Sequence, residues 1–128
     1  MLLALHLVVG VLFMAVSLVE AGWAYVAYRR RSPLPPGYWR LLRASAGLIA
    51  WQIVTGVTFI ALGRYPRDGL HFMYAALVTA TVAACELLRP TASLGRILRE
   101  EQRFAEAGVY AGLTLLAALF ALRLWMTG

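Results

Sequence analysis

Four long apolar runs constrain this chain more than any other feature. A helix that crosses a bilayer needs about 20 mostly apolar residues, and the runs Leu2–Ala27, Ala44–Gly63, Leu70–Leu88 and Ala107–Met126 meet that requirement. The 128 residues are 62% hydrophobic and 14% charged, whereas soluble domains are roughly half apolar and a quarter charged. We therefore expect one all-α transmembrane domain. Because the connections are short, we expect an up-down-up-down four-helix bundle with the first and third helices diagonal.

The first run could be mistaken for a cleaved signal peptide. It has no basic residue ahead of its apolar stretch, that stretch is too long, and no clear small-residue cleavage motif follows. We expect a retained transmembrane helix.

The arginines are distributed unevenly between the two ends of the predicted bundle. The net charge is +6, with 12 basic residues, and all of them are Arg. The connections 28–43 and 89–106 hold every Arg except three, Arg64, Arg67 and Arg123. The positive-inside rule places the Arg-rich connections in the cytoplasm and both termini outside, in a prokaryotic inner membrane. No basic helix face or aromatic-lined groove points to nucleic acid.

A weak internal repeat relates the two halves of the chain at an offset of about 65 residues. Leu5-His6 falls on Leu70-His71, and Glu20 falls one residue from Glu86. A parallel repeat of two helical hairpins would explain the matches. Chance similarity between Ala- and Leu-rich helices explains them equally well.

The two histidines of the chain, His6 and His71, occupy equivalent positions. Each lies about one turn inside the outer end of its helix, and diagonal helices in a bundle are roughly 11–14 Å apart when neighbours pack 8–10 Å apart. Two neutral imidazoles that converge across such a gap are suited to ligating a haem iron from both sides. We therefore predict a haem b site with His6 and His71 as the axial ligands.

The surroundings of the two histidines suit a bulky macrocycle. Small residues follow each His by one turn, and others lie on the outer halves of the second and fourth helices: Gly10, Ala75, Gly56, Ala117, Ala118 and Ala121. Haem propionates need cations, and the three outer arginines would supply charge-assisted hydrogen bonds: Arg64, Arg67 and Arg123.

This layout resembles known membrane haem proteins. Paired histidines on diagonal helices hold the haems of cytochrome b, and each half of haem A synthase is a four-helix bundle with a paired-histidine site. The resemblance rests on His6, His71, the four predicted helices and the arginines of the loop on the histidine side. It implies a b-type haem protein in electron transfer, with a quinone or another respiratory membrane protein as partner. The glutamates here lie far from the histidines, unlike the acidic residue of haem A synthase, which argues against oxygenation chemistry.

Other interpretations of the histidines stay open. A His one turn inside a membrane helix is commonly an interfacial residue that bonds a carbonyl or water. Zinc is disfavoured because its sites use three or four protein ligands.

Glu20 and Glu86 form a second matched pair toward the cytoplasmic side. Glu86 is three residues from Arg89 and is expected to form a helix ion pair. For Glu20 we expect an ion pair with a loop arginine, and the alternative is a site that binds a proton or a quinone. Three polar residues of the second helix are expected to form interhelical hydrogen bonds: Gln52, Thr55 and Thr58.

Gly47 and Gly112 occupy matched positions, where small residues permit close helix approach or a homodimer contact. Cys85 stands alone, so an intrachain disulfide is excluded and a buried apolar role is expected. No nucleotide-binding or hydrolase motif is present.

Two further functions compete with a cytochrome. A cofactor-free accessory or assembly subunit of a larger membrane complex would suit the small size and minimal loops. Transport is weaker because few polar residues lie in mid-membrane, unless Glu20, Gln52 and Glu86 converge. We expect a carrier or binding protein rather than a stand-alone enzyme.

Overall fold

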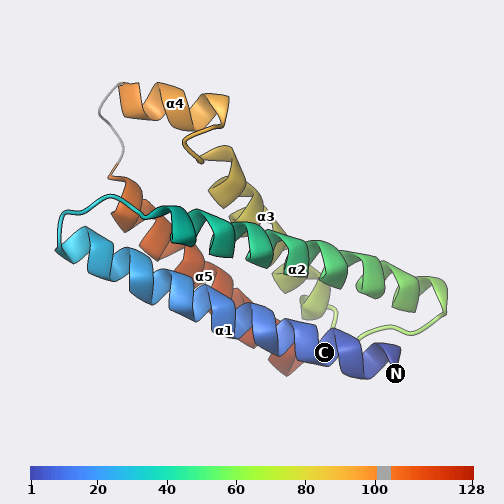
Figure 1. Ribbon diagram of the computed structural model, residues 1–128. Coiled ribbons are helices and arrows are strands. Elements are labelled where there is room, and N and C mark those ends of the chain that lie inside the picture. The colour runs from blue at the N-terminus through green and yellow to red at the C-terminus, as the bar shows by residue number, and fades with distance from the viewer. Residues whose placement is uncertain (101–104) are drawn as a thin grey trace.

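The computed structural model describes residues 1–100 and 105–128, and this part of the chain is helical with short connections (Figure 1). Four helices are long and apolar enough to cross a membrane, and a fifth, short helix precedes the last of them. Their bounds are α1 Leu2–Arg29, α2 Pro36–Ala61, α3 Leu70–Leu87, α4 Ser93–Glu100 and α5 Glu106–Thr127. The chain is therefore an all-α integral membrane protein.

Helix α2 begins at Pro36, earlier than the predicted start at Ala44. Pro35 is extended, with φ −74° and ψ 161°, and Pro36 occupies the first turn. Proline fits that position because the first helical N–H groups have no partner within the helix. Arg40 and Arg43, which were expected in a loop, are consequently helical.

Both helices of the first hairpin end in the same capping arrangement. At the end of α2, Gly63 has φ 72°, and the Arg64 N–H bonds the Phe59 carbonyl at 2.9 Å. At the end of α1, Arg31 takes the corresponding place with φ 51°. Left-handed residues of this kind satisfy the last carbonyls of a helix and turn the chain.

The connection between α3 and α5 contains a short helix. Helix α4 occupies Ser93–Glu100, α5 begins at Glu106, and residues 101–104 lie outside the described part of the chain. In Figure 1, α4 projects from the end of α3, away from the four long helices. Gly95 of α4 is buried against the carbonyls of Leu88 and Arg89.

The long helices pair in a definite order. Within the described residues, α1 packs against α2 and α5, and α3 packs mainly against α5 and only slightly against α2. In the same part of the chain, the backbone of α1 does not approach that of α3, and the backbone of α2 does not approach that of α5. Side chains still meet across the interior, since Tyr38 and Trp39 of α2 pack edge-on against Tyr110 of α5. The helices that carry His6 and His71 therefore lie opposite each other.

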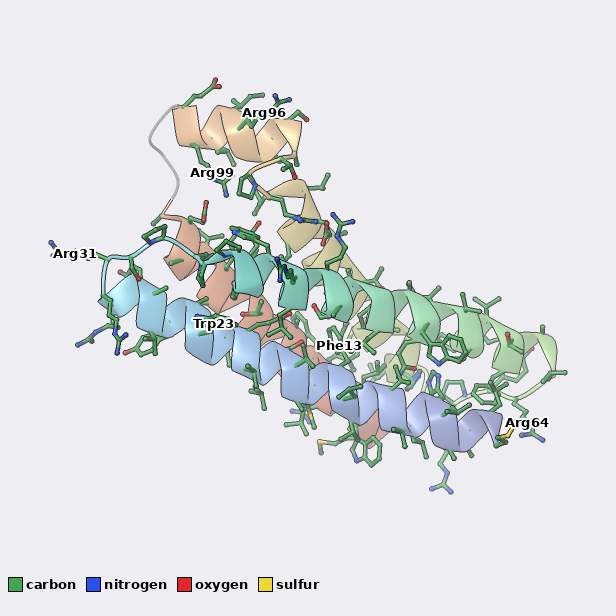
Figure 2. The ribbon with its side chains drawn as sticks, viewed as in Figure 1. Phe13, Trp23, Arg31, Arg64, Arg96 and Arg99 are labelled. Carbon is green, nitrogen blue, oxygen red and sulfur yellow. The ribbon has the colours of Figure 1, made fainter. Side chains whose placement is uncertain are left out.

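Two apolar clusters form the interior. Phe13, which Figure 2 labels, belongs to the cluster nearer the histidines, with Ile49, Val78, Ala117 and Ala121. The other lies toward the first loop and contains Ala24, Ala27, Leu34, Tyr38, Leu42, Cys85 and Tyr110. Cys85 is 2% exposed, so its predicted burial is confirmed.

Candidate functional site

His6 lies in the second turn of α1 and is held by α2. Its Nδ1 atom is 2.7 Å from the Thr55 hydroxyl oxygen. That hydroxyl also lies 3.0 Å from the Trp51 carbonyl of its own helix, to which it donates its hydrogen. A hydroxyl engaged in this way can accept from His6 Nδ1–H, and that tautomer leaves the lone pair of the imidazole on Nε2.

Gln52 makes a second connection between the same two helices. Its Nε2 donates to the backbone carbonyl of His6 at 2.7 Å, and its Oε1 atom is buried without a hydrogen-bond partner. A Cβ at Gly10 would lie 3.1 Å from Gln52 Nε2. Gly10 thus accommodates the Gln52 amide. The predicted interhelical bonds of Gln52 and Thr55 are confirmed.

Phe59 packs edge-on against the His6 ring, with centroids 5.5 Å apart and an interplanar angle of 85°. Thr58, one residue before it, does not reach another helix. Its hydroxyl is exposed and donates to the Val54 carbonyl at 2.8 Å. The prediction that Thr58 bonds across helices was wrong, because its side chain faces away from α1.

His71 lies in the first turn of α3 and packs against the end of α5. Asp68 starts that helix by accepting the Leu70 N–H at 2.9 Å through its carboxylate. The His71 ring lies beside the Leu124 carbonyl and close to Gly128. Its Nδ1 atom is buried without a hydrogen-bond partner.

The two imidazoles lie toward the same end of the molecule, His6 near the start of α1 and His71 at the start of α3 (Figure 1). The backbones of these two helices do not approach each other among the described residues. The folded chain thus brings together the two histidines that the sequence singles out. A pair of imidazoles, at least one with a free Nε2, is a donor set that suits a bis-histidine haem iron.

The small residues that were predicted to surround the cofactor differ in their exposure to solvent. Ala75 and Gly56 are half-buried, and a Cβ at Gly56 would meet no neighbouring atom within 4 Å. The small residues of α5, by contrast, are buried: Ala117, Ala118 and Ala121.

The three outer arginines are exposed: Arg64, Arg67 and Arg123. Arg123 lines a cavity of about 570 Å³ together with Tyr74, Phe120 and Met126. Figure 2 shows Arg64 at one end of the molecule and Arg31, Arg96 and Arg99 at the other.

The glutamates differ in their partners. Glu86 pairs with Arg89 at 3.0 Å, as predicted, and Arg43 lies 4.0 Å away. Glu20 is 1% exposed and makes no ion pair within the described residues. The prediction that Glu20 forms an ion pair with a loop arginine was therefore wrong within the described residues, because the Glu20 side chain points into the interior.

The glycines at matched positions do not bring helices together. Gly47 and Gly112 are exposed, and a Cβ on either would meet no atom within 4 Å. The prediction of close helix approach within the chain was wrong at both positions.

No family model matches this chain, and neither a curated protein nor a solved structure is detectably similar to it.

Proposed function

We propose that the protein is a membrane-embedded b-type haem protein that takes part in electron transfer, with His6 and His71 as axial ligands. The observation that carries the proposal is the position of these two imidazoles on opposite helices at one end of the molecule. Intramembrane ionisable residues are costly to bury, so a matched pair favours a ligand-binding role.

The residues around His6 have defined parts in this proposal. Thr55 accepts the Nδ1 hydrogen and fixes the ring orientation, so that Nε2 is the ligating atom. Gln52 holds the backbone carbonyl of His6 and thereby fixes the first turns of α1 to α2. A bound haem would supply one-electron chemistry, and the protein would supply ligands, orientation and electrostatics. Arg64, Arg67 and Arg123 would bind its propionates.

The proposal includes an orientation in the membrane. The four helices form an up-down-up-down bundle with the haem near the outer face of a prokaryotic inner membrane. The arginine asymmetry between the two ends supports cytoplasmic placement of the first and third loops. A quinone or a respiratory membrane protein would then exchange electrons with the site.

An absorbance spectrum tests the proposal most directly. Protein purified from haem-replete cells should be red and show a reduced-minus-oxidised b-type spectrum. His6→Ala and His71→Ala should each abolish it, whereas the matched surface change Tyr65→Phe should leave it unchanged. Colourless, folded protein from such cells would overturn the proposal. If that protein co-purified with partners at fixed stoichiometry, it would be a cofactor-free subunit.

A further inference from the structure

A polar layer separates the two apolar clusters of the interior. Each long helix has residues in both clusters, and between them it contributes one buried hydroxyl to this layer. The four hydroxyls belong to Ser17 of α1, Ser45 of α2, Thr81 of α3 and Thr114 of α5. Glu20 lies one turn beyond Ser17 on α1 and is 1% exposed. Sequence patterns did not point to these hydroxyls, because single Ser and Thr residues are common in membrane helices.

Glu20 lies in the half of α1 that is nearer the first loop. It is nine residues before Arg29, hence about 14 Å along the axis at 1.5 Å per residue. None of the ion pairs in the described residues involves it, since Arg43 and Arg89 pair with Glu86, and Arg99 pairs with Glu106.

Among the residues that the structure describes, the groups that face Glu20 carry no compensating positive charge. Ser45 and Tyr38 approach from α2, and Cys85 approaches from α3, with Tyr110 of α5 beside it. Tyr and Cys side chains are neutral in their ordinary forms at pH 7. An isolated carboxylate in such a place costs far more than a neutral carboxyl, so the group binds a proton instead.

The hydroxyls of the layer are arranged to accept a hydrogen bond. Ser45 donates its hydrogen to the Leu42 carbonyl at 2.9 Å, and Thr114 donates to the Tyr110 carbonyl at 2.6 Å. Their oxygen lone pairs are left for another donor. Meanwhile Glu20 Oε1, Ser17 Oγ and Tyr38 OH are buried without a hydrogen-bond partner. A protonated Glu20 carboxyl can donate its O–H to the free lone pair of the Ser45 hydroxyl.

We propose that Glu20 is a proton-binding site inside the membrane, where burial without a cationic partner keeps the carboxyl neutral and the Ser45 hydroxyl accepts its hydrogen bond. The O–H of the carboxyl donates to the Ser45 hydroxyl in the protonated state, and release leaves the carboxylate facing Ser17 and Tyr38. This site is separate from the histidine pair, so the inference does not depend on haem binding.

Infrared spectroscopy of the full chain in lipid nanodiscs tests this assignment. At neutral pH the protein should show the C=O stretch of a protonated carboxyl, and this band should shift in D2O. Glu20→Gln should remove the band, whereas Glu86→Gln, which changes the ion-paired glutamate, should leave it. Persistence of the band in Glu20→Gln, or its absence from the native protein, overturns the proposal.

A second variant covers the case in which Glu20→Gln does not fold. Ser45→Ala removes the proposed acceptor and should shift the carboxyl band without abolishing it, whereas Thr58→Ala, at an exposed hydroxyl, should not. An unshifted band in Ser45→Ala overturns the proposal. Loss of the native band on adding Na⁺ would instead show an alkali cation site with an ionised Glu20.

Discussion

The Nδ1 atom of His6 lies 2.7 Å from the hydroxyl oxygen of Thr55, and this contact joins the start of α1 to the last turns of α2. Because the Thr55 hydroxyl donates to its own helix, it acts as an acceptor for the imidazole. The bond therefore fixes both the tautomer and the orientation of a ring that the proposed function uses as a metal ligand.

Removing this acceptor should weaken cofactor binding. In Thr55→Val the ring loses its partner, and loss of such a partner typically costs 10–100-fold in affinity. Titration of the cofactor-free protein with haem measures the change. Thr55→Ser should restore most of the affinity, and Thr58→Val, whose hydroxyl is exposed, should have no effect. Equal affinity in Thr55→Val and the native protein would contradict the role assigned to Thr55.

Gly95 should tolerate no side chain. A Cβ there would overlap the Arg89 carbonyl oxygen and lie 2.5 Å from that of Leu88. Since both atoms belong to the backbone, Gly95→Ala should lower the free energy of unfolding by about 1–3 kcal/mol. Thermal unfolding in detergent measures it. Gly112→Ala is the matched control, because its Cβ would meet nothing within 4 Å. Equal melting temperatures for both variants would show that α4 does not pack as described.

Arg99 connects the ends of three helices. Its Nη1 atom donates to the carbonyls of Leu88 at 3.1 Å and Gly95 at 2.8 Å, and its Nε donates to Glu106 at 2.6 Å. Lysine cannot reproduce this planar set of donors. Arg99→Lys should therefore lower stability by about 1.5–3 kcal/mol, the usual range for hydrogen bonds to charged groups. Denaturant titration would measure it, with exposed Arg96→Lys as the control. A loss no larger than that of Arg96→Lys would refute the connecting role.

The proposed orientation predicts which loops are labelled from outside the cell. Cys85 is buried and alone, so Cys85→Ala provides a cysteine-free background. In that background Tyr65→Cys should react with a membrane-impermeant thiol reagent on intact spheroplasts. Ser32→Cys should react only after permeabilisation, because the Arg-rich first loop faces the cytoplasm. The opposite pattern would invert the topology and place the histidines near the cytoplasmic surface.

The sequence by itself determined the features that depend on composition along one helix. Four apolar runs of sufficient length predicted the transmembrane helices, and the spacing of Glu86 and Arg89 predicted their ion pair. The bounds of three long helices were close to those observed. The start of α2 was not, since the apolar run begins only at Ala44, whereas the helix continues back through polar residues to Pro36 in its first turn.

Only the tertiary structure decided how each helix is rotated about its axis. That rotation points Thr55 toward His6 and leaves Thr58 exposed, although three residues separate them. It also turns Glu20 inward, away from the arginines and toward Ser45 of α2. In a membrane every face of a helix is apolar, so hydrophobic periodicity does not mark the buried side, and only packing against neighbouring helices fixes it.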